Sequence, residues 1–214
     1  LKMDGLASSL IYVDGLLTKA ITRGDGLVGE DITQNVKTIS SVPLVLKGIH
    51  KGLLEVRGEI VMSKATLARL NKKYEKEGRP LLANTRNAAA GSVRQLDPKL
   101  ARERSLDFFA WDIARGTDKK THAELHAHLR EIGFVVAPFE GVAPDLQEVE
   151  KVISYIEQQR NTLEYGTDGV VIQVNALALH QALGVVGKAP RYAIAYKYAA
   201  EQAATTVTAI SIQV

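Results

Sequence analysis

The sequence predicts an α+β fold, with helices inserted among antiparallel strands. Apolar runs at 7–13 and 16–22 flank Asp14-Gly15, and Asp-Gly between two such runs is a strong signal for a two-residue hairpin. Helical patterns follow singly, without the regular strand–helix alternation that builds a parallel sheet. The chain has 214 residues, of which 46% are hydrophobic, so it can fill a substantial core.

The first predicted helix follows a strand at 53–62. Ser63 can cap this helix and Gly78 can close it. The segment 79–104 fits neither a helix nor a strand clearly, and its Ala-Ala-Ala-Gly run at 88–91 indicates a packed loop or a short helix that brings backbone close to a ligand. The residues that share the apolar face of the first helix are Leu67, Leu70 and Tyr74.

A second strand and helix pair is predicted from residue 107 onwards. The strand covers 107–114, and Thr121 with Glu124 forms a capping box that opens the helix. Gly133 ends it, and FVVAP (134–138) resumes a strand. The apolar stripe of this helix consists of Leu125, Leu129 and Ile132.

The last predicted helix begins at Asp145, with Glu148 in its first turn. Strands follow at 169–174 and 192–198, and the final segment, TTVTAISIQV (205–214), alternates as a further strand. This last strand predicts the start of a second, β-rich domain. The residues of the helix that we expect to face inwards are Val149, Val152, Ile153 and Ile156.

Composition excludes several classes of protein. Cysteine is absent, which rules out a disulfide framework and a thiolate metal site. The apolar runs are shorter than the ~20 residues of a membrane span, and no signal segment is present. We therefore expect a cytoplasmic protein with no membrane contact, and a fragment, because the chain begins without an initiator Met.

Positive charge is concentrated in one stretch. The whole chain carries a net charge of +3, whereas the stretch from 79 to 104 alone reaches +4. Such a stretch favours phosphate groups as partners, although a solvated face balanced elsewhere would look the same. The charged residues of the stretch are Arg79, Arg86, Arg94, Lys99, Arg102 and Arg104, against Asp97 and Glu103.

Several polar residues interrupt otherwise ordinary strands and loops. The run TRGDGLVGEDIT (22–33) places Arg23 among three glycines, which suits phosphate or ribose recognition, but it lacks the spacing of a P-loop and fits a simple loop equally well. Glu59 and Lys197 each lie within a strand. On its own, each of these two is more often a solvated residue.

The aromatic and imidazole side chains favour structural interpretations. His122, His126 and His128 lie on one helix without a third metal ligand at a suitable spacing, so a solvated helix face is the favoured interpretation. Trp111, in DFFAWDIA, is more often a core residue than a platform for a base.

Six segments stand in order along the chain: KMDG (2–5), TRGDGLVGEDIT (22–33), EVRGE (55–59), ANTRNAAAGSVRQLDP (83–98), TDGVVIQVN (167–175) and APRYAIAYKY (189–198). Together they resemble the adenylation domain of bacterial NAD-dependent DNA ligases, over essentially the whole chain. The resemblance implies the nucleotidyltransferase (ATP-grasp-like) fold, with two antiparallel sheets flanked by helices and a nucleotide cleft between them. The stretch at 83–98 separates this family from ATP-dependent ligases and capping enzymes.

The resemblance assigns the covalent chemistry to Lys2. Its amine would attack the α-phosphate of NAD, expel nicotinamide mononucleotide and form lysyl-AMP. A free lysine has a pKa of about 10.4, so the site has to favour the neutral amine. AMP would then pass to the 5′-phosphate of a DNA nick, and the 3′-hydroxyl would displace it to seal the strand.

The resemblance also implies roles around this lysine. Asp4 would orient the site, Arg23 and Glu59 would hold the nucleotide and its ribose, Trp111 would lie against the adenine, and Lys197 would contact the α-phosphate. The arginines implied in contacts with the nucleotide or with DNA phosphates are Arg86, Arg94 and Arg160.

The cofactors and partners follow from the same resemblance. NAD donates AMP, and Mg²⁺ or Mn²⁺ lies near Asp4 and Glu59 through water, without a direct protein ligand. Zn²⁺ belongs only to a C-terminal part beyond this chain. Nicked double-stranded DNA is the expected partner of a monomer that acts in DNA replication and repair, in the bacterial cytoplasm at the nucleoid.

The chain departs from the family at one site residue and at both ends. Gln173 stands where the family has a phosphate-contacting lysine, so we expect impaired activity unless Lys188 or another cation substitutes. The small domain that recognises the nicotinamide half would precede Lys2. The adenylation domain covers 1–200, and an oligonucleotide-binding (OB) fold begins at 201–214. The fragment is expected to be weakly active or inactive.

Two alternatives remain at this stage. The first is a catalytically impaired relative that binds nucleotide or nucleic acid, which Gln173 favours. The second is a nucleotidyltransferase that uses ATP.

Overall fold

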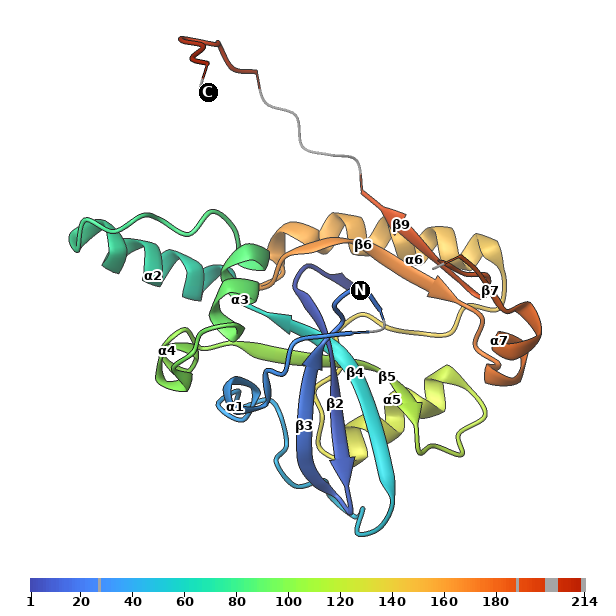
Figure 1. Ribbon diagram of the computed structural model, residues 1–214. Coiled ribbons are helices and arrows are strands. Elements are labelled where there is room, and N and C mark those ends of the chain that lie inside the picture. Colours follow the sequence, from blue (N-terminus) through green and yellow to red (C-terminus); the bar gives the residue numbers. More distant parts are fainter. Residues whose placement is uncertain (27, 188, 199–203, 213–214) are drawn as a thin grey trace.

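The computed structural model describes residues 1–26, 28–187, 189–198 and 204–212. Its strands form a four-stranded antiparallel sheet in the order β3-β2-β4-β5, a three-stranded antiparallel sheet in the order β1-β6-β9, and a small β7-β8 pair (Figure 1). The strands are β1 (Lys2–Met3), β2 (Leu6–Val13), β3 (Leu16–Thr22), β4 (Leu53–Val61), β5 (Asp107–Arg115), β6 (Thr167–Gln173), β7 (Val185–Val186), β8 (Ala189–Pro190) and β9 (Ala193–Lys197).

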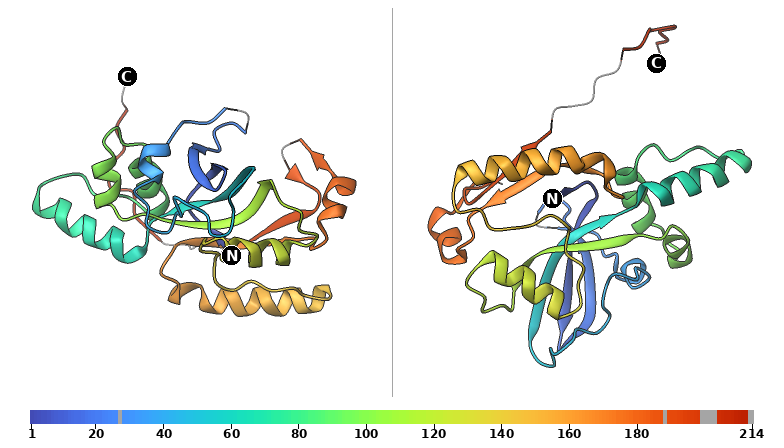
Figure 2. Two further views of the ribbon diagram at one scale, coloured as in Figure 1. Left: turned by 90° about the horizontal axis from the view of Figure 1, so that it is seen from below. Right: turned by 180° about the vertical axis from the view of Figure 1, so that it is seen from behind.

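Helices surround both sheets, which confirms the predicted α+β class. In both views of Figure 2, α6 runs along the outer face of the three-stranded sheet, whereas α2 projects from the body. None of the described helices combines the length and apolarity needed to cross a bilayer. The helices are α1 (Thr33–Val36), α2 (Lys64–Lys76), α3 (Thr85–Val93), α4 (Pro98–Glu103), α5 (His122–Glu131), α6 (Leu146–Gln159) and α7 (Leu177–Leu183), with a 3₁₀ turn at Arg160–Thr162.

The first hairpin forms as predicted. Asp14 and Gly15 both have positive φ angles, 52° and 79°, as a two-residue turn of type I′ requires. A Cβ at Gly15 would lie 2.1 Å from the Ile49 carbonyl oxygen, so glycine is needed there for space as well as for φ.

The main core lies against the four-stranded sheet. Leu10, Val56, Ile60 and Phe108 are fully buried in it. A small second cluster, Met3, Val61 and Phe109, joins β1 of one sheet to β4 and β5 of the other. A third packs α6 onto β6 and consists of Ile156, Val170 and Tyr198.

The predicted helix caps are confirmed. Ser63 accepts a hydrogen bond from the Thr66 N–H at 3.1 Å, and Asp145 accepts one from the Glu148 N–H at 2.9 Å. At the start of α5, the Thr121 side chain caps the helix and Glu124 completes the capping box. These signals are local in sequence, which is why they could be predicted.

The segment 79–104 contains two helices. Asn84 caps α3 through the Asn87 N–H at 2.8 Å, in agreement with the short-helix alternative for 88–91. Asp97 caps α4, which has Pro98 in its first turn. Helix α4 was not predicted, although Asp-Pro is a typical helix start.

Three expectations about secondary structure and the packing of helices were wrong. Segment 134–138 forms no strand: its one bridge joins Val136 to Ala110 of β5, and its alternation reflects burial of Phe134 and Val136 alone. Val152 of α6 is 39% exposed instead of facing inwards, because only one row of this helix contacts β6. Residues 204–212 contain no helix or strand; a strand needs a partner edge, and residues 213–214 of that prediction lie outside the described residues.

Candidate functional site

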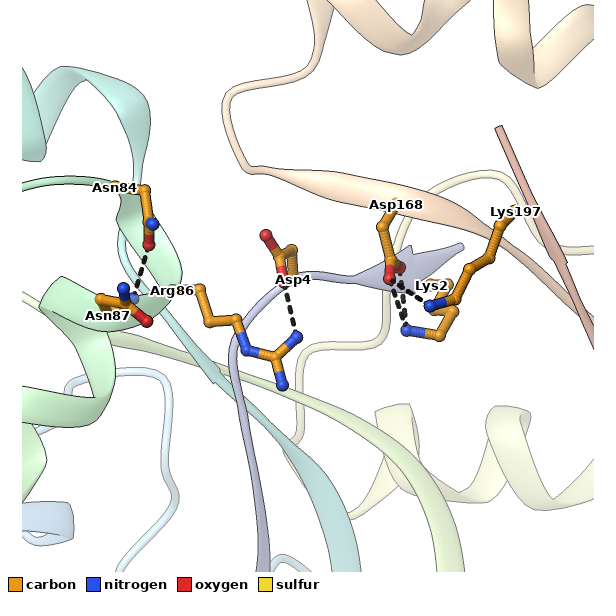
Figure 3. A network of polar contacts seen from close by, with 7 residues as sticks. All are labelled: Lys2, Asp4, Asn84, Arg86, Asn87, Asp168 and Lys197. Carbon is orange, nitrogen blue, oxygen red and sulfur yellow. Dashed lines mark hydrogen bonds and ion pairs between the residues drawn. The ribbon is translucent and has the colours of Figure 1, made fainter. Parts of the chain in front are cut away.

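Two lysines converge on one carboxylate. Lys2 Nζ donates to both carboxylate oxygens of Asp168, at 2.9 and 2.8 Å, and Lys197 Nζ lies 3.9 Å from Asp168 Oδ2 (Figure 3). The pairing is set by the sheet, since Lys2 and Lys197 both lie opposite Gly169 on β6. A Cβ at Gly169 would lie 1.9 Å from the Tyr196 carbonyl oxygen, so only glycine permits this approach.

A second ion pair lies on the adjoining turn. Arg86 Nη1 is 3.1 Å from Asp4 Oδ1, and Figure 3 shows Arg86 directed from α3 towards Asp4. The Asp4 N–H donates to the Gly166 carbonyl oxygen at 2.8 Å. A Cβ at Gly5 would lie 2.2 Å from the Ile60 carbonyl oxygen, so the glycine after Asp4 lets this turn lie directly against β4.

Glu59 on β4 completes the cluster. Burial raises the pKa of Glu59 from 4.5 to about 7, while the positive charges of Lys2 and Arg86 and a hydrogen bond from the Gly5 N–H oppose this rise. These interactions place the Glu59 carboxyl near the start of β1, although it lies on the other sheet. Desolvation of a carboxyl group that has cationic neighbours is typical of functional sites.

We call this set the lysine cluster. It holds three cations and three acids, so it is close to neutral before a ligand binds. Its cations are accessible, since the side chains of Lys197 and Arg86 are 68% and 57% exposed. An incoming phosphate could therefore compete with the carboxylates for these cations. The members of the cluster are Lys2, Asp4, Glu59, Arg86, Asp168 and Lys197.

The structure brings together five predicted residues and adds one. Lys2, Asp4, Glu59, Arg86 and Lys197 were candidates from the sequence. Asp168 had no predicted role, although it is the residue that joins the two lysines. The available signal was an Asp-Gly pair at the start of a strand, which is too common to single out.

Three further candidates lie outside this network of contacts. Among the described residues, no hydrogen bond or ion pair links the side chains of Arg23, Trp111 or Gln173 to the lysine cluster. Arg23 is exposed where β3 ends, and its N–H donates to the Ala7 carbonyl oxygen at 2.9 Å. Trp111 is 42% exposed on β5, so its interpretation as a core residue is wrong.

Gln173 lies on the same face of the sheet as Lys197. Directly opposed residues share a face, and the register pairs Gly169 with Lys197 and Gln173 with Ala193. Since side chains alternate along a strand, Gly169 and Gln173 also share that face. Gly169 and Gln173 are four positions apart, which is about 13 Å along the strand.

Two candidate arginines are paired elsewhere. Arg94 Nε lies 2.6 Å from Glu30 Oε2, and this pair joins α3 to the glycine-rich loop at 22–33. The Arg160 guanidinium carbon lies 5.3 Å from the centre of the Tyr198 ring, at the end of α6. Neither arginine contacts the lysine cluster directly in the described part of the chain.

The described residues contain no group of three or more His, Cys, Asp or Glu side chains placed to hold a metal ion. Asp4 and Glu59 are the carboxyl groups of the cluster that do not hold Lys2. Asp4 keeps a second oxygen beside the one that faces Arg86, so the two can accept hydrogen bonds from the water shell of a cation. The arrangement fits a hydrated ion better than direct coordination.

Two antiparallel sheets that meet beside a lysine held by an aspartate are consistent with a nucleotidyltransferase of the adenylating class. The chain belongs to the NAD-dependent DNA ligase adenylation domain family, whose pattern matches residues 1–201. It is 47% identical over 215 residues to a DNA ligase of Acetivibrio thermocellus and 50% identical over 216 residues to a DNA ligase of Carboxydothermus hydrogenoformans. A DNA ligase of Neisseria gonorrhoeae is 46% identical over 218 residues.

These relatives are considerably longer than the chain. Each alignment covers all of this chain, but only 32% of the first two relatives and 26% of the third. The chain therefore spans about a third of their length or less.

Proposed function

We propose that this chain carries out the AMP-transfer steps of a NAD-dependent DNA ligase. The observation that carries the proposal is the position of Lys2: its amine is held by Asp168 beside Lys197, next to a buried carboxyl group, in a chain of the ligase family. Lys2 and Asp168, whose side chains meet in this site, are 166 positions apart in the sequence.

The first step joins AMP to Lys2. The amine attacks the α-phosphorus of NAD, a nitrogen–phosphorus bond forms, and the phosphoanhydride bond to nicotinamide mononucleotide breaks. The attacking nitrogen loses a proton to solvent, and nicotinamide mononucleotide leaves with its phosphate. Lys197 would neutralise charge on the α-phosphate, a role supported by its sharing of Asp168 with Lys2.

The remaining residues would bind the nucleotide and the DNA. Glu59 and Arg23 hold the ribose and the nucleotide, and Trp111 lies against the adenine. Asp4 orients the site together with Arg86. In the following steps AMP passes to the 5′-phosphate of nicked double-stranded DNA and is displaced by the 3′-hydroxyl; Arg94 and Arg160 contact the phosphates.

A hydrated Mg²⁺ or Mn²⁺ ion would be held near Asp4 and Glu59 through water. When bound, it would neutralise negative charge on the phosphates of NAD. The protein's own part is to keep these two carboxyl groups on adjoining elements, as the Asp4 N–H contact with Gly166 and the Gly5 contact with Glu59 do.

The setting of this activity is also part of the proposal. We propose an adenylation domain at 1–200, an OB fold that begins at 201–214, and a monomer that acts in DNA replication and repair in the cytoplasm at the nucleoid. Zn²⁺ belongs to other parts of such a ligase.

A second candidate function is binding of nucleotide or nucleic acid without turnover. The observation that favours it is Gln173, which can donate a hydrogen bond but brings no positive charge to the face it shares with Lys197. Lys188, a cation that could compensate, lies outside the described residues.

The test is a chimeric ligase in which this chain replaces the matching segment of the Carboxydothermus hydrogenoformans relative. Sealing of a nicked duplex is measured with NAD or with ATP as the AMP donor. We expect the chimera to seal the nick with NAD and not with ATP. Sealing with ATP would favour an ATP-using nucleotidyltransferase. Absence of sealing by both the chimera and its Gln173→Lys variant, with AMP binding retained, would favour the binding function.

A further inference from the structure

The β5 strand has two residues without a partner on β4, Trp111 and Ala114, and the first of these is a candidate site residue. In the β4–β5 ladder, Gly58 lies opposite Ala110 and Arg57 lies opposite Asp112, so Trp111 has no partner. A β-bulge of this kind re-aims a side chain and leaves one residue unpaired. The Trp111 carbonyl oxygen therefore needs a hydrogen-bond donor from outside the sheet.

Two histidines supply that donor. His126 Nε2 lies 3.0 Å from the Trp111 carbonyl oxygen, and His122 Nε2 lies 3.2 Å from it. The two residues are one turn apart on α5, and their ring centres are 4.2 Å apart. A solvated helix face, the interpretation favoured from the sequence, is therefore wrong for this pair.

His126 is held from both sides. Its Nδ1 contacts the Glu140 carboxylate, which also pairs with Arg130. The Trp111 carbonyl oxygen can only accept, so Nε2 of His126 donates to it, while the Glu140 carboxylate lies against the other ring nitrogen. Burial lowers the pKa of His122 to about 4, with the charge of His126 as the second cause, so His122 serves as a neutral donor.

The same turn of α5 is tied to the other sheet. The His122 N–H donates to the Asn175 carbonyl oxygen at 2.8 Å, and the Ala123 N–H donates to Asn175 Oδ1 at 3.0 Å. Asn175 follows Gln173, the last residue of β6, by two positions. The start of α5 thus joins the Trp111 bulge to the strand that carries Asp168.

We propose that His126, with His122 beside it, is a positioning residue for the nucleotide base. It holds the bulged carbonyl of Trp111 and so fixes the direction of the indole ring against adenine. This inference rests on the proposed function, in which Trp111 contacts the adenine of NAD.

The test uses the 214-residue chain and its only tryptophan. His126→Leu removes the donor and is expected to shift the Trp111 fluorescence emission and to weaken AMP binding, measured calorimetrically, by about three- to tenfold, less than the full loss of a base-stacking contact. In His126→Gln a side-chain N–H can still reach the carbonyl, so this variant should restore both properties.

His128→Leu is the matched control. It makes the same change on the same helix, and His128 contacts Glu131 instead of β5; it should leave emission and AMP affinity as in the unaltered chain. Circular dichroism checks folding. If His126→Leu does not fold, His126→Asn replaces it, because its shorter amide does not reach the carbonyl.

Trp111→Ala separates this inference from the proposed function. If Trp111→Ala weakens AMP binding but His126→Leu changes neither emission nor affinity, the positioning inference alone is overturned. If Trp111→Ala leaves AMP affinity unchanged, the base-contact role of Trp111 is overturned, and the inference with it.

Discussion

At the level of single residues, Lys2 is subject to two opposing requirements. The ion pair with Asp168 holds the Lys2 amine against a carboxylate, whereas the proposed attack on phosphorus requires a nitrogen lone pair that is free to reach the phosphate. Lys197 competes for the same carboxylate, and an incoming phosphate would draw both cations. We infer that the Lys2–Asp168 pair is the resting arrangement, and that nucleotide binding has to loosen it before AMP is transferred.

Glu59 should make the stability of the domain depend on pH. Its pKa is about 7 in the folded chain against 4.5 otherwise, so the folded state binds more protons between these values. The free energy of unfolding should therefore fall as pH rises through this window. Ionisation of the buried Glu59 carboxyl group therefore costs folding free energy at pH 8. Glu59→Gln should remove this cost and raise the free energy of unfolding at pH 8 by about 1–2 kcal/mol, measured by chemical denaturation.

Glu55→Gln is the control for this change. Glu55 lies on the same strand and pairs with Arg57 and Arg115, so its replacement should leave stability unchanged or reduce it. A Glu59→Gln chain no more stable than the unaltered chain at pH 8 would contradict the burial argument.

Gln173→Lys should increase the rate of AMP transfer in the chimeric ligase. The new cation would extend from the face shared with Lys197 and neutralise phosphate charge, with an expected gain of about 30-fold, or ~2 kcal/mol. Single-turnover formation of lysyl-AMP measures it. Gln158→Lys adds the same charge on exposed α6 and should have no effect; an equal rate for all three proteins would contradict the assigned role of position 173.

At the level of elements, Gly58 determines how closely β4 and β5 pack. A Cβ at Gly58 would lie 2.2 Å from Phe108 Cζ and 2.5 Å from the Phe109 carbonyl oxygen. Gly58→Ala should therefore lower the free energy of unfolding by about 1–3 kcal/mol, as measured by denaturant titration.

Gly91→Ala is the matched control, with the opposite expected sign. Gly91 lies within α3, and an added Cβ would meet no atom within 4 Å. Alanine should raise the free energy of unfolding by about 0.5–1 kcal/mol, because it restricts the unfolded chain. Equal effects of the two substitutions would contradict the packing account of β4 and β5.

The elements that could be predicted from the sequence are those with local signals. The hairpin at Asp14-Gly15 and the capping box at Thr121 are specified within a few residues. The segment 134–138 alternates like a strand because its side chains alternate in burial, and no local signal reveals that it makes one bridge only. Likewise, whether Trp111 is paired depends on the register between β4 and β5, so its unpaired position could not be read from its own strand.

At the level of the whole molecule, the candidate site exists because two sheets meet. β1 pairs with β6 in one sheet, and the chain passes through Asp4 and Gly5 directly into β2 of the other. A further link is the hydrogen bond from the Tyr165 hydroxyl to Asp107 Oδ2 at 2.9 Å. The resemblance predicted most members of the lysine cluster, but Asp168 and the partners of each cation required the tertiary structure.

The central claim is that Lys2 accepts AMP. The most direct measurement is to incubate the chimeric ligase with NAD without DNA, digest it, and locate the adduct by mass spectrometry. Our account predicts one AMP group, on the peptide that carries Lys2, and none in a Lys2→Arg variant. An adduct on Lys197 or another residue, or an adduct that persists in Lys2→Arg, would contradict it.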